Sequence, residues 1–285
     1  MNEVPAPSFA RAVYENMVAS YWNLAVGLGG YAIEVQGANL VWAGREVAQF
    51  NLAMIAPGER PSAAILATAA DFFGTLSGPW FLVLPSNAAA PPSFEAHHVE
   101  RAMVCDRPTV SIHNPVPEVR GVRAAGAGGP GPDTRRELRA PPGRERASPG
   151  IRRAETPADL EIATLLTTEA FGLPPDALQP ARKLSSTPWR PWDRPGETYL
   201  LEVNGETVAT ASLNFFAGEA GIYGVATKSR YRGRGLARRI VSHAHATALS
   251  YGYPRTVLQA VPGAERVYMT AGFKTVEIFT HYRPV

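Results

Sequence analysis

The sequence predicts a mixed α/β protein of two domains, and three observations lead to this fold class. Over residues 151–285, short apolar runs rich in β-branched residues alternate with longer runs of helical periodicity. Residues 9–105 repeat this order of elements. Between them, residues 115–150 are dense in Pro, Gly, Ala and Arg and contain no aromatic residue. A chain of 285 residues, of which 45% are hydrophobic, is long enough for two cores.

The N-terminal half begins with an expected helix over residues 9–24. Phe9, Val13, Met17 and Leu24 share one face of this helix, and the glycines of residues 27–30 end it. The next helix is expected to start at a proline, which is favoured at the first helical position. The elements expected after the first helix are strands at 31–35, 40–42, 50–56, 79–84 and 98–105, with the second helix at 61–73.

The C-terminal half opens with an expected strand at 151–154. Thr156 and Pro157 suit the N-cap and first position of a helix that ends near Gly172. Asn204-Gly205 is typical of a type I′ turn and predicts a β-hairpin. The hairpin strands are expected at 198–203 and 207–216. Further strands are expected at 222–227, 256–261 and 274–282, with a helix at 236–250 and a short segment around Tyr268.

The charge distribution argues against a nucleic-acid partner. The formal net charge is +3, and residues 115–150 alone carry seven Arg and four acidic residues, which leaves the rest of the chain neutral. We expect residues 116–150 to be a linker, because they cannot bury enough apolar surface to offset the entropy of ordering them. The alternative is an arginine-rich arm for nucleic acid.

Other composition signals concern the cellular compartment and metals. No apolar run reaches the ~20 residues of a membrane span, and no signal peptide is expected. The single cysteine, Cys105, is expected to be a buried, unreactive thiol in a reducing cytoplasm. His243 and His245 are two apart on a helix, so they cannot chelate one metal, and we expect both at the surface. No metal site is expected.

Residues 221–250 combine a strand-like run, a loop of alternating Gly and Arg, and a helix. Gly233 and Gly235 allow close approach of the backbone to an anion and a positive φ, and the free N–H groups of the first helical turn then face that anion. A P-loop is excluded because no Gly-Lys-Ser/Thr follows. A dinucleotide fold is excluded because Arg238 occupies its third glycine position. A solvated turn that caps a surface helix is the alternative.

The pattern Arg230-x-x-Gly233-x-Gly235 resembles the acetyl-CoA diphosphate loop of the GNAT superfamily of N-acetyltransferases. The later order of strand, Tyr268, Gly272-Phe273 and closing strand is similar to the second half of the same family. This resemblance implies a mostly antiparallel central sheet flanked by helices. It also implies direct transfer of an acetyl group from acetyl-CoA, as co-substrate, to a primary amine. The alternative is a CoA-binding sensor or interaction protein of this fold without turnover.

The resemblance also implies site residues. Tyr268 is expected as the general acid toward the CoA sulfur; the alternative is a core tyrosine. No general base is identified: Glu219 and Glu265 are candidates, and the family often uses an ordered water. The backbone of one strand would hold the pantetheine and the thioester oxygen, and the loop would hold the diphosphate. These cofactor-binding residues are Val225, Ala226, Thr227, Arg230, Arg232, Gly233, Arg234, Gly235, Leu236 and Ala237.

The predicted organisation is a degenerate GNAT-like domain at 1–115, a linker at 116–150 and a catalytic domain at 151–285. The N-terminal counterpart of the loop, residues 57–61, has one glycine, the carboxylate of Glu59 and the N–H-free Pro61, so it suits a diphosphate poorly. The resemblance implies that residues 174–196 contact the acceptor substrate. The alternative is a loop held in place by two buried tryptophans. We expect a small-molecule amine rather than a protein as acceptor, no membrane partner, and a monomer or homodimer.

Overall fold

The computed structural model describes residues 8–35, 37–76, 78–106, 149–174, 177–178 and 196–285. Most of the predicted linker and the two tryptophans at 189 and 192 lie outside these described residues. The helices are α1 (Phe9–Leu28), α2 (Ala63–Gly74), α3 (Pro157–Phe171), α4 (Leu236–Ser250) and α5 (Glu265–Thr270). The strands are β1 (Tyr31–Val35), β2 (Ala38–Trp42), β3 (Leu52–Ile55), β4 (Phe81–Pro85), β5 (Phe94–Cys105), β6 (Gly150–Arg153), β7 (Glu197–Val203), β8 (Glu206–Phe216), β9 (Glu219–Thr227), β10 (Thr256–Ala260) and β11 (Lys274–Pro284).

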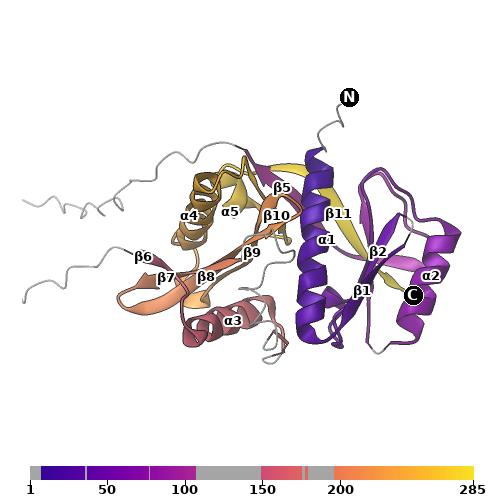
Figure 1. The fold of residues 1–285 in the computed structure, drawn as a ribbon, viewed down its shortest axis with the longest axis horizontal. Helices are drawn as coiled ribbons and strands as arrows, with labels where there is room; N and C mark the ends of the chain where they lie inside the picture. The colour runs from indigo at the N-terminus through magenta and orange to yellow at the C-terminus, as the bar shows by residue number, and fades with distance from the viewer. Residues whose placement is uncertain (1–7, 36, 77, 107–148, 175–176, 179–195) are drawn as a thin grey trace, which may run out of the picture.

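All of these strands join one sheet in the order β1-β2-β3-β4-β11-β5-β10-β9-β8-β7-β6. The pairs β3–β4 and β9–β10 are parallel, and the other pairs are antiparallel. Helices flank the sheet (Figure 1). The predicted fold class, a mixed and mostly antiparallel sheet with flanking helices, is therefore confirmed.

The two halves of the chain exchange strands. β11, from the end of the chain, lies between β4 and β5 of the N-terminal half, while β5 lies between β11 and β10 of the C-terminal half. Each half therefore receives one strand from the other at an equivalent position. β11 lies next to β4 of the parallel pair β3–β4, and β5 lies next to β10 of the parallel pair β9–β10. The predicted boundaries at 115 and 151 divide the chain but not the sheet, and the division into independent domains stays a prediction.

Helix α1 spans both halves, as Figure 1 shows. It packs on β8, β9 and β10 as well as on β1, β2 and β5. The cluster beneath it combines Val13 and Met17 of α1 with Met54, Val104 and Val257 of three different strands. A second cluster lies between the C-terminal strands and helices α4 and α5, and a third lies beneath α2. None of the described helices is long and apolar enough to cross a bilayer.

Local sequence signals explain several element boundaries. Thr156 caps α3 and forms a capping box with Asp159, and Pro157 is the first helical residue. Asn204 and Gly205 both have positive φ, so the predicted type I′ hairpin between β7 and β8 is confirmed. Helix α1 runs four residues beyond its predicted end at 24 and stops at Gly29, which has φ 87°.

The predicted surface position of His245 is wrong. His245 is completely buried, and its Nδ1 lies 2.8 Å from the Thr256 hydroxyl. Its Nε2 lies 3.5 Å from Cys105 Sγ, which is buried as predicted. His243 is half-buried beside the ring of Tyr199, with ring centroids 4.9 Å apart. The buried residues of α4 include the consecutive Ile240, Val241 and Ser242, so burial extends beyond a single narrow stripe of this helix.

Candidate functional site

Strands β9 and β10 separate shortly after they meet. Their parallel pairing comprises only Ala220 with Thr256 and Gly221 with Val257. From residue 222 to 227, β9 has no partner on the β10 side within this described part of the sheet. This edge can bind an extended ligand through its backbone, because unpaired strand edges offer a row of donors and acceptors. The carbonyls of Gly224 and Thr227 already accept from the side chains of Thr167 and Arg232.

A β-bulge interrupts β9 inside this open stretch. The register with β8 shifts between Tyr223 and Ala226, and Gly224 there has φ 58°. A bulge changes which face of the sheet the following side chains meet. Tyr223 accordingly reaches α1, while the side chain of Val225 packs against the cluster under α4 and α5.

The loop after β9 forms an uncapped helix N-terminus. Gly233 and Gly235 both have φ 74°, and a Cβ on either glycine would meet no atom within 4 Å. No side chain caps α4, whose first residues are Leu236 and Ala237. The N–H groups of its first turn therefore have no partner inside the helix, and they carry the positive end of its dipole.

The arginines around this N-terminus divide into two groups. Arg230 lies 2.5 Å from Glu206 of β8 and stacks on Tyr231, so it orders the loop. Arg232 donates to the carbonyl of Thr227 at the end of β9, and Arg234 donates to the carbonyl of Arg230 in the loop. By contrast, the exposed Arg238 and Arg239 lie near the helix N-terminus, where the dipole disfavours cations. Arginines placed against the helix dipole are typical of a binding site, because a bound anion offsets their repulsion from the positive helix end.

Tyr268 lies on α5, buried and 8% exposed. Its ring packs edge-on against Phe273, with centroids 6.2 Å apart. Burial, helped by the negative charge of Glu100, raises the pKa of Tyr268 to about 12, so its hydroxyl keeps its proton at neutral pH. Tyr268 and Leu236 belong to one hydrophobic cluster, and Val225 packs against it. The structure thus brings Val225, Leu236 and Tyr268, one residue each from the predicted strand, the start of the helix and the predicted acid, into one cluster.

The two carboxylates considered as general bases are both engaged. Glu219 is 6% exposed and accepts hydrogen bonds from Arg255, whose Nε lies 2.9 and 3.0 Å from its two oxygens. This pair lies beside the Ala220–Thr256 contact and so ties β9 to β10 at the point where they meet. Glu265 lies 3.6 Å from Arg101 of β5. Both carboxylates are therefore already partners of arginine side chains.

Polar residues that the sequence analysis did not select lie on the opposite face of the sheet. Asn16 of α1 is completely buried and donates to the carbonyls of Phe216 and Glu219, at 2.9 and 3.1 Å. It also accepts a hydrogen bond from Tyr223. Glu100 of β5 lies close enough to influence both Tyr223 and Tyr268 electrostatically. No sequence pattern links these residues, since they come from elements far apart along the chain.

The corresponding part of the N-terminal half has a different geometry. Strands β3 and β4 pair along three consecutive positions, from Leu52 with Phe81 to Met54 with Val83, which is most of the length of β3. Helix α2 is capped by the Ser62 hydroxyl, which accepts from the N–H of Ile65 at 3.2 Å. The strand edge that is open in β9 is closed here, and one first-turn donor is already satisfied.

Comparison with known families gives a match in the same region. Residues 162–273 match the sequence model of the Acetyltransferase (GNAT) family. This range begins in α3, includes β9, the glycine loop and α4, and ends at Phe273. A comparison with curated proteins gave no match.

Solved structures with the same fold extend over nearly the whole chain. A GCN5-related N-acetyltransferase from Kribbella flavida has 16% identity and a TM-score of 0.65, covering 98% of this chain and 96% of its own. One from Sphaerobacter thermophilus has 14% identity and a TM-score of 0.55, covering 98% and 93%. A putative GNAT acetyltransferase from Novosphingobium aromaticivorans has 19% identity and a TM-score of 0.51, covering 94% and 99%. At these identities the likeness establishes the fold.

Proposed function

Because residues 162–273 match the sequence model of the Acetyltransferase (GNAT) family, we propose that this protein transfers an acetyl group from acetyl-CoA directly to a primary amine. The observation that carries the proposal is the open edge of β9, followed by the uncapped N-terminus of α4. A thioester with a long polar arm and a terminal diphosphate matches this order of features: an extended strand edge for the arm and a helix N-terminus for the phosphates.

The diphosphate would be held by backbone N–H groups of residues 233–237, with Arg238 and Arg239 able to add charge-assisted hydrogen bonds. Free N–H groups of Val225 and Thr227 would hold the pantetheine and polarise the thioester carbonyl. The side chains of Arg230, Arg232 and Arg234 already bond within the protein, so their role in this proposal is to order the loop.

In the reaction, the amine nitrogen attacks the thioester carbon, a C–N bond forms and the C–S bond breaks. The amine loses one proton, and the departing sulfur gains one. Tyr268 would supply the proton to sulfur, and its hydroxyl carries that proton at neutral pH. Its place in the cluster with Leu236 and Val225 supports a position near the bound thioester.

We further propose that α1 forms one wall of the acceptor site. The predicted donor-side residues lie on the face of the sheet covered by α4 and α5, whereas Asn16 and Tyr223 meet on the face covered by α1. For direct transfer, the donor and the acceptor would enter the gap between β9 and β10 from opposite faces of the sheet. The N-terminal half would then be retained because its first helix shapes the acceptor pocket, rather than because it binds a second acetyl-CoA.

The test is release of free CoA thiol from acetyl-CoA in the presence of a panel of small primary amines. We expect turnover with at least one amine class, above the rate of hydrolysis without amine. Calorimetric binding of CoA without turnover across the panel would contradict the proposal and favour the CoA-binding sensor. Tyr21 of α1 lies close enough to Tyr223 and Glu100 to interact with both electrostatically. A Tyr21→Ala variant is therefore expected to change KM for the amine but not for acetyl-CoA.

A further inference from the structure

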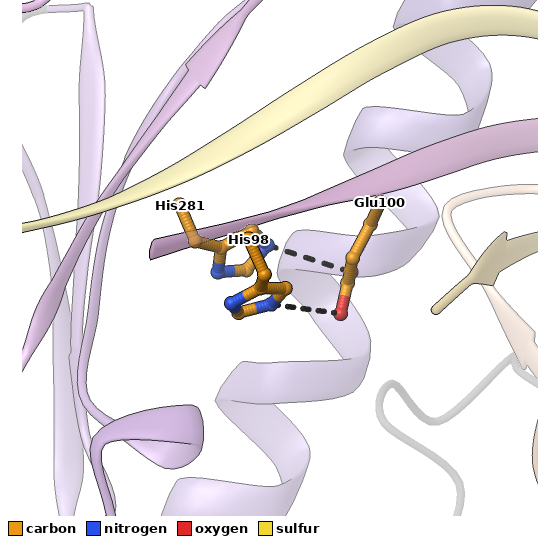
Figure 2. A group of neighbouring side chains, drawn as sticks. All are labelled: His98, Glu100 and His281. Atoms are coloured by element: carbon orange, nitrogen blue, oxygen red, sulfur yellow. Dashed lines mark ion pairs between the residues drawn. The ribbon is translucent and has the colours of Figure 1, made fainter. Parts of the chain in front are cut away.

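Three ionisable side chains meet where the exchanged strands pair. His98 and Glu100 lie on one face of β5, and His281 of β11 is the direct partner of His98 in the strand register. One ligand atom from each of the three residues lies within 4.8 Å of the others. Figure 2 shows both imidazoles directed at the same carboxylate. The Nε2 atoms of His98 and His281 lie 3.6 and 3.5 Å from the two Glu100 oxygens.

Two buried polar atoms of this cluster, the ring nitrogens of His281, lack a hydrogen-bond partner in the described part of the chain. His281 is 2% exposed, yet neither ring nitrogen makes a hydrogen bond within the described residues. Leaving a buried polar group without a partner typically costs about 1–3 kcal/mol. Two imidazole nitrogens and one carboxylate thus face a common point.

We propose that His98, Glu100 and His281 bind one divalent transition-metal ion, with zinc as the best match. Two imidazole nitrogens and one carboxylate oxygen form a common ligand set for Zn²⁺ with a fourth position left to water. Magnesium and calcium prefer oxygen ligands, and no further carboxylate belongs to this cluster among the described residues. Zinc bonds of about 2.0–2.2 Å require the three ligand atoms to move closer together than they lie here.

The surroundings of the cluster fit a metal site. Nδ1 of His97 lies 2.9 Å from Nδ1 of His98, so the other ring nitrogen of His98 is oriented toward Glu100. Metal-binding histidines are commonly oriented by a hydrogen bond to the remaining nitrogen in this way. The imidazoles of His98 and His281 stack with centroids 4.2 Å apart. The His98 side chain is 21% exposed, which leaves a route for the ion and for a water ligand.

A bound ion would connect the two halves of the chain. His98 and Glu100 belong to the N-terminal half, whereas His281 belongs to the last strand. The metal would therefore cross-link β11 to β5 and stabilise the strand exchange, since a ligand that binds only the folded state raises its stability. This role is independent of acyl transfer, so its test does not depend on the proposed function.

The experiment uses the full chain without an affinity tag, freed of metal by chelation. Calorimetry with Zn²⁺ is expected to give one ion per chain, and Zn²⁺ is expected to raise the melting temperature reversibly. Co²⁺ is expected to produce the visible absorption of a tetrahedral site. Mg²⁺ at the same concentration is expected to change neither signal. Absence of stoichiometric Zn²⁺ binding to the wild-type chain would overturn the proposal and leave a charge-balanced ion pair.

Variants assign the ligands. His281→Gln and Glu100→Gln are expected to weaken Zn²⁺ binding by at least about tenfold and to remove the Zn²⁺-dependent rise in melting temperature. His98→Gln, at a more exposed position, is the second choice if His281→Gln does not fold. His243→Gln on α4 is the matched control and is expected to bind as the wild type does. Unchanged Zn²⁺ affinity in folded His98→Gln or His281→Gln would refute the assignment.

Discussion

The Oδ1 atom of Asn16 on α1 accepts a hydrogen bond from the hydroxyl of Tyr223 on β9, at 2.5 Å, across 207 residues of sequence. Burial raises the pKa of Tyr223, so its hydroxyl stays protonated and remains a donor. The two residues lie next to Gly221, where a Cβ would approach Asn16 Oδ1 to 2.2 Å. The absence of a side chain at Gly221 is therefore what allows α1 to lie against β9.

Asn16→Ala is expected to lower the free energy of unfolding by roughly 2–3 kcal/mol, because two buried carbonyls and one hydroxyl lose their partner. Chemical denaturation measures the change. Asn87→Ala, at an exposed position, is the control and should change stability by less than about 0.5 kcal/mol. Equal effects of the two substitutions would show that Asn16 does not tie the halves together.

Gly235→Ala is expected to reduce affinity for CoA by at least about tenfold. A Cβ there has space, but the positive φ of 74° is strained by about 1–2 kcal/mol for an alanine, so the loop shifts away from the geometry that exposes its N–H groups. Gly252→Ala after α4 is the matched control, since Gly252 has φ 89° and also no neighbour within 4 Å of a Cβ. Calorimetry should find CoA affinity unchanged in the control. Equal CoA affinity in both variants would remove the diphosphate from this loop.

Tyr268→Phe is expected to keep CoA binding and to lower kcat by about 10²–10⁴-fold, equivalent to roughly 3–5 kcal/mol. Phenylalanine keeps the ring beside Phe273 but removes the proton donor. Tyr31→Phe, exposed on β1, is the control. Steady-state kinetics with the best amine give both constants, and full activity of the variant at neutral pH would make Tyr268 a core residue only.

The raised pKa of Tyr268 predicts how the wild-type protein responds to pH, and the thiol of CoA predicts how Tyr268→Phe differs from it. Tyr268 ionises near pH 12 in the folded protein and near 10 when unfolded, so the stability it contributes is complete below pH 10 and is lost as pH rises through 12. Below pH 10 the wild-type rate should therefore not fall through ionisation of Tyr268. The deficit of Tyr268→Phe should shrink as pH rises past about 8.5, because the departing thiol then leaves as a stable thiolate. A deficit that stays constant with pH would contradict proton donation to sulfur.

Acetyl-CoA is expected to occupy one site per chain. The N-terminal counterpart has a capped helix, Glu59 and Pro61 in its loop, and no separated strand edge. A calorimetric titration gives the stoichiometry, and Gly235→Ala should weaken all of the binding. Two sites, or residual tight binding in that variant, would show that the N-terminal half also binds CoA.

Local features of the fold were predictable from the sequence because they depend on neighbouring residues. The capping box at Thr156 and the turn at Asn204-Gly205 are contained within a few positions, and the structure has both where they were expected. The positive φ of Gly233 and Gly235 likewise follows from residues of a single loop. Helix α1 passed its predicted end because a single glycine inside a packed helix costs only about 1 kcal/mol.

Long-range features were not predictable in this way. No property of residues 274–284 indicates that they pair with β4 and β5 rather than with the strands of their own half. The His98, Glu100 and His281 cluster depends on that pairing, as the burial of His245 depends on the packing of Cys105 and Thr256 around it. The spacing of residues along a helix predicts which side chains share a face. It does not predict how many of those faces other elements cover, and this is why the surface position expected for His245 was wrong.

The strand exchange has a consequence for synthesis on the ribosome. Residues 81–105 emerge long before residues 274–284, so the facing edges of β4 and β5 stay without their central partner while most of the chain is made. Unpaired edges template aggregation, and contacts distant in sequence form slowly. The N-terminal half thus cannot complete its sheet as the chain emerges, and its protection from aggregation during translation depends on α1, chaperones, or temporary pairing between β4 and β5.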